Sequence, residues 1–189
     1  MGVLLDVLGS VIIAATLFLM MMTFQLQMQE TAARIHYTGS MIDHMDTAAS
    51  KLNHIMAMAG IGVPVDSVCV IADESRLVFR TFWNCESDTL SEDRHLIDIK
   101  LGDSTQHGSI LEINQDGTLI EPLGYILYIE DVAFNYYDKN DNQTTTPANV
   151  MSAEILLTFR RDSPWRQDQP LRTNIQLKCF FMNSYLQGA

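Results

Sequence analysis

Basic residues are missing from the start of this chain. The first 33 residues contain no Lys or Arg, and their only acids are Asp6 and Glu30. Over all 189 residues the acids outnumber the basic side chains by 23 to 12, which gives a formal net charge of −11. Proteins that bind nucleic acid neutralise its phosphates with a broad basic surface, which this composition does not provide. We therefore expect no nucleic-acid partner.

Motifs of catalysis, nucleotide binding and metal binding are also absent. The sequence has no GxSxG, no Walker loop, no GxGxxG and no CxxC. No two of its five histidines are four residues apart, the spacing that places two metal ligands on one face of a helix. These absences predict a protein that is not an enzyme, with no catalytic residues, no cofactor and no metal centre.

Cysteine is too scarce for a dense disulfide scaffold, because the chain contains only Cys69, Cys85 and Cys179. In an exported domain, Cys69 and Cys85 can form a disulfide across a short loop, with Cys179 as a small buried apolar residue. The alternative is that all three thiols are reduced and packed in the core. The sequence leaves both arrangements open.

The N-terminal segment has a long uncharged run over residues 7–24. At about 1.5 Å per residue, eighteen helical residues nearly cross a hydrocarbon core of about 30 Å. A secretory signal peptide has a basic n-region, which is missing here. Residues 1–33 are therefore predicted to form a hydrophobic helix that anchors the chain in a membrane, with the larger C-terminal part exported.

Helical periodicity continues over residues 34–63, the predicted amphipathic half of the same helix. Gly60, Gly62 and Pro64 are typical of a helix end. The apolar stripe fits either a coiled-coil seam or a face packed on a sheet, and the strands that follow favour the sheet. Its members are Ile35, Thr38, Ile42, Met45, Ala49, Leu52, Met56 and Ala59.

Residues 64–189 are predicted to form one globular antiparallel β domain, because the apolar period changes to two after Pro64. Asp116-Gly117 separates two short apolar runs and indicates a hairpin turn. The expected fold class is α+β, with the long N-terminal helix packed on an antiparallel sheet. The strand candidates are residues 68–71, 77–83, 96–101, 110–113, 118–120, 126–137, 153–159 and 175–181.

Five segments together resemble the type IV pilin superfamily, and above all the J-type minor pseudopilins of type II secretion and the W-type minor pilins. They are GVLLDVLGSVIIAATLF at the start, MAMAGIGV at the helix end, IEDVAFNYYDKNDN, SAEILLTFRRDSPW, and IQLKCFFMNSY near the C-terminus. The resemblance covers nearly the whole chain. It implies a pilin-like fold and a structural role in a type IV pilus or a type II secretion-like filament.

The resemblance also implies a location and partners. The chain would be held in the cytoplasmic (inner) membrane by a single pass, with its C-terminal domain extracytoplasmic, and would then enter an extracellular or periplasmic filament. Its partners would be other pilin-like subunits, contacted through the N-terminal helix, and the assembly machinery of the pilus or secretion system.

Two residues acquire roles from the resemblance. Gly2 corresponds to the glycine at which a peptidase processes the family, although the family's basic leader does not precede it here. Asp6 corresponds to the acid that pairs with the α-amino group of a neighbouring subunit, although it lies one place away from the family's Glu. The alternative for Asp6 is a position at the membrane interface near the helix N-terminus, where the helix dipole favours an anion.

A rival interpretation is a membrane-anchored exported domain that binds a ligand or a partner protein. Its predicted pocket would be lined by aromatic residues of the strands and of a turn-rich segment, namely Tyr125, Tyr128, Tyr136, Tyr137 and Trp165.

One turn offers a weak calcium candidate. Asp138, Asn140 and Asn142 place oxygen ligands at alternating positions, as Ca²⁺ sites do. The segment lacks the glycine and the distal bidentate Glu of an EF-hand loop, so a polar hairpin turn is the simpler interpretation.

Overall fold

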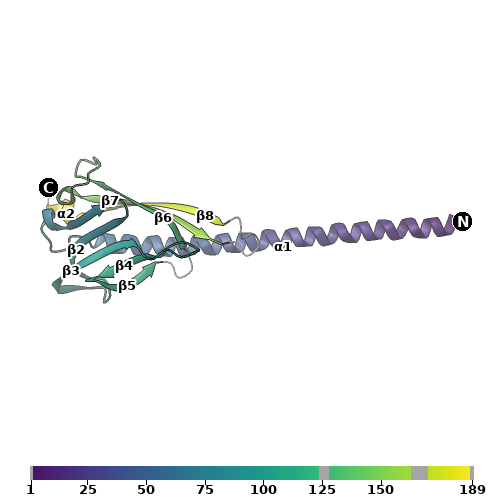
Figure 1. Ribbon diagram of the computed structural model, residues 1–189, viewed down its shortest axis with the longest axis horizontal. Coiled ribbons are helices and arrows are strands. Elements are labelled where there is room, and N and C mark those ends of the chain that lie inside the picture. Colours follow the sequence, from purple (N-terminus) through teal and green to yellow (C-terminus); the bar gives the residue numbers. More distant parts are fainter. Residues whose placement is uncertain (1, 124–127, 163–169, 188–189) are drawn as a thin grey trace. The chain divides into compact units, whose positions relative to one another are not determined.

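The computed structural model describes residues 2–123, 128–162 and 170–187, and the chain divides into two compact units, residues 1–40 and 41–189. Helix α1 (Gly2–Ala57) makes up the described part of the first unit and continues into the second (Figure 1). The helix contains no proline, which would remove a backbone hydrogen bond. The described hydrophobic segment and residues 34–57 of the predicted amphipathic segment therefore belong to one helix, whereas residues 58–63, also predicted to be helical, lie beyond its end.

The prediction that glycines follow the end of the helix is confirmed. Gly60 and Gly62 follow the helix with φ values of 76° and 71°, a left-handed conformation that glycine adopts without steric cost. The amide of Gly60 then donates to the carbonyl of Arg80, which ties the end of the helix to a strand.

The second unit contains all the other elements. Its strands form two antiparallel sheets, one with the order β1-β2-β3-β4-β5 and one with the order β6-β7-β8. The elements are η1 (Val65–Ser67), β1 (Cys69–Asp73), β2 (Arg76–Asn84), β3 (Thr89–Leu101), β4 (Leu111–Gln115), β5 (Thr118–Leu123), β6 (Tyr128–Tyr137), η2 (Pro147–Asn149), β7 (Ser152–Arg161), β8 (Leu171–Phe180) and α2 (Met182–Gln187).

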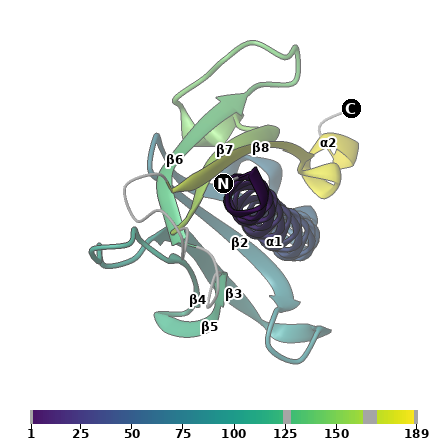
Figure 2. The ribbon, with the colours of Figure 1, turned by 90° about the vertical axis from the view of Figure 1, so that its right-hand side faces the viewer.

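The α+β class is confirmed, but the single sheet expected from the sequence is divided in two. Hydrogen bonds between β6 and the β1–β2 hairpin join the sheets. The Phe134 amide donates to the Glu74 carbonyl, and the hydroxyl of the buried Tyr136 lies within hydrogen-bonding distance of the carbonyls of Asp73 and Arg76, which share its hydrogen. Figure 2 shows the two sheets as separate groups of strands. Alternation along a strand indicates which face is apolar but not which strand lies beside it.

The buried face of α1 begins at Met41 and includes Met45, which are 1% and 5% exposed. The prediction that Ile35 and Ile42 belong to this face is wrong, since they are 68% and 55% exposed. Residues three and four positions before Met45 both lie near its side of the helix, so periodicity alone does not choose between Ile42 and Met41. Further along, the predicted stripe is confirmed at Leu52, Met56 and Ala59.

The strand patterns are confirmed where the sequence alternates most clearly. In β6, Val132, Phe134 and Tyr136 are buried together, and Ile155, Leu157 and Phe159 are buried in β7. The predicted hairpin joins β4 to β5 through Asp116 and Gly117, both with positive φ. Helix α2 follows β8 without a sequence signal that predicted it, and its buried Ser184 lies against Gly60.

Candidate functional site

The first unit presents an uncovered apolar helix surface, which is the main candidate site. The large apolar side chains of its first part are exposed all around the helix, although burial of apolar area is what normally stabilises a helix in water. Those with at least half of their surface exposed are Val3, Val7, Leu8, Val11, Ile12, Ile13, Leu17, Phe18, Leu19, Met20, Met21, Phe24, Leu26 and Met28. We call residues 7–28 the apolar segment.

The hydroxyl hydrogens of serine and threonine inside the apolar segment are satisfied by the backbone of the helix itself. The hydroxyl of Ser10 donates to the carbonyl of Val7 at 2.9 Å, and that of Thr16 to the carbonyl of Ile13 at 2.8 Å. Thr23 donates in the same way to the carbonyl of Leu19. A polar group left without a partner in lipid costs several kcal/mol, so these bonds suit the helix to a hydrocarbon environment. These hydrogen bonds were not predicted from the sequence, although serine and threonine in an apolar helix indicate them.

The apolar segment makes α1 the one helix of the described residues that is long and apolar enough to cross a membrane. A signal sequence near an N-terminus has the same properties.

Gly2 and Asp6 both lie in the N-terminal turns of α1 and outside any packed core. A Cβ atom on Gly2 would meet no atom within 4 Å, and the side chain of Asp6 is exposed. The carboxylate of Asp6 has no hydrogen bond or ion pair with another described residue.

The three cysteines are free thiols, so the Cys69–Cys85 disulfide considered from the sequence is not formed. Cys69 lies opposite Phe79 in the β1–β2 register, whereas Cys85 follows the end of β2. Six residues of extended chain span about 20 Å, far more than the roughly 7 Å that a disulfide allows between Cα atoms. Burial raises the pKa of Cys69 to about 12 and that of Cys85 to about 11, which disfavours the reactive thiolates.

The calcium candidate is a hydrogen-bonded turn. Oδ1 of Asp138 accepts from the amides of Asn140 at 2.8 Å and Asn142 at 2.9 Å. These bonds lower the pKa of the Asp138 carboxyl. Asp141 adopts a positive φ of 63° and pairs with Lys178. Among the described residues, no group of three or more His, Cys, Asp or Glu side chains could hold a metal ion.

The three described tyrosines of the proposed pocket do not gather in one place. Tyr136 is buried and bonds to backbone carbonyls, while the Tyr137 hydroxyl donates to Glu154 on the sheet surface. The ring of Tyr128 lies 5.4 Å from that of His107, with the two ring planes tilted by 31°. The other two proposed lining residues, Tyr125 and Trp165, lie outside the described residues.

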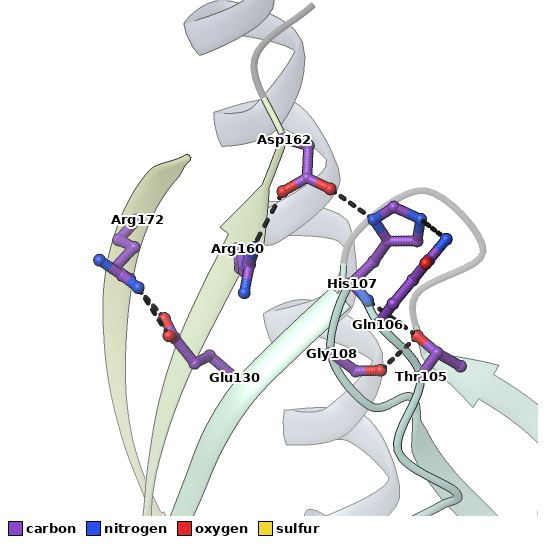
Figure 3. A network of polar contacts seen from close by, with 8 residues as sticks. All are labelled: Thr105, Gln106, His107, Gly108, Glu130, Arg160, Asp162 and Arg172. Carbon is purple, nitrogen blue, oxygen red and sulfur yellow. Dashed lines mark hydrogen bonds and ion pairs between the residues drawn. The ribbon is translucent and has the colours of Figure 1, made fainter. Parts of the chain in front are cut away.

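A polar network joins the β3–β4 loop to the end of β7 (Figure 3). Nδ1 of His107 bonds to Oδ2 of Asp162, and Arg160 bonds to the other carboxylate oxygen. The His107 bond is the main cause that lowers the pKa of Asp162. The hydroxyl of Thr105 donates to the carbonyl of Gly108 rather than to the imidazole, so the network holds a loop and places no activated hydroxyl.

Histidine–aspartate pairs occur at three places in the second unit, and none of them was predicted from the sequence. Besides His107–Asp162, the structure pairs His54 with Asp88 at 2.9 Å and His95 with Asp116 at 2.7 Å. Each pair connects residues at least 20 positions apart, and no local motif announces such contacts.

A second polar cluster centres on Glu154 on the outer face of the three-stranded sheet. Its carboxylate accepts from Gln176 at 2.6 Å, Tyr137 at 2.9 Å and Asn135 at 3.2 Å. These hydrogen bonds, the one from Gln176 first, lower the pKa of Glu154 below its ordinary 4.5.

Replacing Glu154 by Gln should therefore destabilise the domain only at pH values at which the native carboxyl is ionised. A group whose folded pKa is depressed contributes stability above its unfolded pKa and loses it as the pH falls through the folded pKa. We expect a loss of about 1 kcal/mol or less at neutral pH, because the site is solvent-screened, shrinking toward zero below the folded pKa. Urea unfolding between pH 7 and 3 measures this, with Glu86→Gln at an exposed turn as the control for charge. A loss that stays constant with pH would contradict the assignment.

The fold and the apolar segment together define a class: a long N-terminal apolar helix followed by antiparallel β-sheets, a pilin-like architecture. Comparison with protein-family models, with curated proteins and with solved structures finds no match to this chain.

Proposed function

We propose that this chain is a structural pilin-like subunit, a minor pilin or pseudopilin, of a type IV pilus or type II secretion-like filament. One observation carries the proposal: a single helix combines an uncovered apolar segment with a C-terminal part buried under antiparallel sheets. The helix would hold the subunit in the cytoplasmic membrane before assembly, with the β domain extracytoplasmic. The role is structural rather than enzymatic.

The apolar segment fits both environments that such a subunit meets. Lipid tails and apolar side chains are similar solvents, so little hydrophobic free energy separates a helix in lipid from a helix among other helices. Close packing and polar pairing then decide the register. Asp6 is the only charged side chain before Glu30, so it is the residue that can fix register by pairing with an amino group of a neighbouring subunit.

Replacing Asp6 by Ala tests this role. A hydrogen-bonded charge pair contributes about 1.5–3 kcal/mol, so incorporation into filaments should fall by roughly tenfold or more. Membrane association and thermal unfolding of the β domain should not change, because Asp6 belongs to neither the apolar run nor the core. The measurement is the fraction of the chain in sheared filaments relative to the membrane fraction.

Asp6→Glu is the matched control, since it keeps the carboxylate and lengthens its reach by one methylene. Incorporation of Asp6→Glu near the native level, with loss in Asp6→Ala, supports pairing. Equal incorporation of the native chain and both variants would show that Asp6 does not pair with a neighbouring subunit. The filament proposal would then depend on whether the chain assembles into filaments at all.

The second candidate function is a single-pass membrane-anchored exported domain that binds a ligand or partner protein. The exposed apolar segment also supports it, because an anchor needs only such a helix. Assembly state separates the two functions. Polymers with residues 3–24 protected between subunits support the filament subunit, whereas a chain that stays monomeric in membranes with all components of the assembly system present supports the anchored domain.

A further inference from the structure

Two sheets leave four edge strands, and edge strands with free backbone groups pair readily with other chains unless something blocks them. Two of the four are short and irregular. β1 has five residues and a register shift between Cys69 and Ile71. β5 has six residues, contains Pro122, and pairs with β4 through a register shift after Ile113. Short length, bulges and proline all hinder the addition of a strand.

The outer edge of β6 is occupied at three places. Ile129 exchanges two backbone hydrogen bonds with Ser109, both 2.8 Å long. The Phe134 amide donates to Glu74, and the Tyr136 carbonyl accepts from the Thr144 amide at 2.9 Å. A further strand has no continuous row of free groups to pair with on this edge.

β8 differs from the other three edges. All ten of its residues pair with β7 in one unbroken register, without a bulge or a proline. Within the described parts of the chain, its backbone makes no hydrogen bond outside the β7 ladder. Figure 2 shows β8 at the border of its sheet, with α2 following its C-terminal end.

The side chains of β8 indicate what kind of strand would fit beside it. The strand carries Arg172 and Lys178 and no acid, within a chain of net charge −11. Both cations lie on the outer face, in register with Arg160 and Glu154 of β7, and the exposed amides of Asn174 and Gln176 lie between them. The alternate positions of the strand point to the inner face, where Ile175 and Leu177 are partly buried.

We propose that β8 is a docking edge for an extended segment of a different polypeptide, which adds as an antiparallel strand with acids facing Arg172 and Lys178 and apolar residues on the alternate positions. Main-chain hydrogen bonds supply affinity in this mode, and side chains supply specificity. Glu130 and Asp141 already pair with the two cations, Glu130 through both of its carboxylate oxygens. These pairs lie on the solvent-exposed surface, where salt and water screen them, so a carboxylate of an added strand can compete for the same cations.

A second copy of this chain that pairs symmetrically about Ile175 is a less suitable occupant. In an antiparallel β8–β8 pair centred on Ile175, Arg172 of each copy lies opposite Lys178 of the other. Like charges directly opposite each other destabilise a strand pair, so the symmetric arrangement is disfavoured at two places. Acids in an added strand turn the same two positions into attractive pairs.

The test uses the full chain in detergent micelles and a fluorescent nine-residue probe, Val-Glu-Val-Thr-Val-Thr-Val-Glu-Val. Its two acids are six residues apart, the separation of Arg172 and Lys178. Fluorescence anisotropy should show saturable binding, about tenfold weaker for the same peptide with Lys in place of Glu. The double variant Arg172→Glu/Lys178→Glu should reverse this preference. A probe whose peptide nitrogens are methylated along the edge that faces β8 should not bind.

Proline substitutions at two neighbouring positions of β8 distinguish a loss of pairing at its free edge from a loss of folding. The amides of Asn174 and Ile175 point to opposite sides of β8, so only one of Asn174→Pro and Ile175→Pro removes a ladder bond to β7. The variant that keeps the native unfolding temperature should lose probe binding.

Three results would overturn the proposal. They are no saturable binding, binding that charge reversal and N-methylation leave unchanged, and dipolar coupling between copies spin-labelled at Asn174→Cys in a Cys85→Ser background. The last result would assign the edge to a second copy.

Discussion

Placing lysine at both Ala14 and Leu17 should remove the chain from the membrane fraction. Both positions lie near the middle of the uncharged run over residues 7–24. A lysine at the centre of a spanning helix costs about 2.5–3.5 kcal/mol on insertion scales, whereas each Leu, Ile, Phe or Val contributes only about 0.3–0.6 kcal/mol. Two lysines therefore exceed what the remaining apolar residues provide. Resistance to carbonate extraction should fall at least about tenfold.

The controls for this result are Ile35→Lys and Ile42→Lys. Both residues are as exposed as those of the apolar segment, at 68% and 55%, but lie beyond the uncharged run. These variants should stay in the membrane. Carbonate-resistant membrane association of the Ala14/Leu17 double variant would show that the helix is not what retains the chain.

Mass analysis of the native chain completes the test, because an anchor and a signal sequence share the same helix properties. A mature chain that keeps residues 7–33 is anchored by them. A mature chain that begins after the apolar segment has used it as a signal, and this result would exclude the filament subunit and the anchored domain alike.

Replacing Gly60 by Ala should destabilise the β domain by about 2–4 kcal/mol. Its φ of 76° costs an L-residue about 1–2 kcal/mol. A Cβ atom would also lie 2.9 Å from Oγ of Ser184 and 3.0 Å from a methyl group of Val68. Such overpacking in a filled core adds about 1–3 kcal/mol. Because Gly60 joins the end of α1 to η1 and α2, neither neighbour can move without disturbing a packed element. Urea unfolding of the chain in detergent measures the loss.

Gly117→Ala is the matched control, because Gly117 has a similar φ of 85° but open space where the Cβ atom would lie. It should cost only the conformational part, about 1 kcal/mol. Ser184→Ala removes a buried hydroxyl that has no hydrogen-bond partner, so it should be neutral or stabilising. Combining it with Gly60→Ala should recover part of the loss but not the contact with Val68. Equal losses for Gly60→Ala and Gly117→Ala would show that the close contacts at Gly60 cost nothing.

The sequence predicted the features that depend on near neighbours. The uncharged run gave the apolar helix, and the glycines after Ala57 gave its end. Alternation in residues 132–136 and 153–159 gave the buried faces of β6 and β7, and Asp116-Gly117 gave the hairpin. In each case one local property decides the outcome, such as a period, a charge count or tolerance of positive φ.

Contacts between distant residues decided the rest. Only packing against the sheets selected Met41 rather than Ile42 for the core, because both fit the helical period. Strand order divided the expected sheet in two, and the β1–β2 register placed Cys69 far from Cys85. The same long-range order brought His107 to Asp162, and it left β8 as an edge without a bulge or a proline, with which no other described segment pairs. A sequence period records which way a side chain points, whereas the neighbour it meets is set by how the strands and α1 come together.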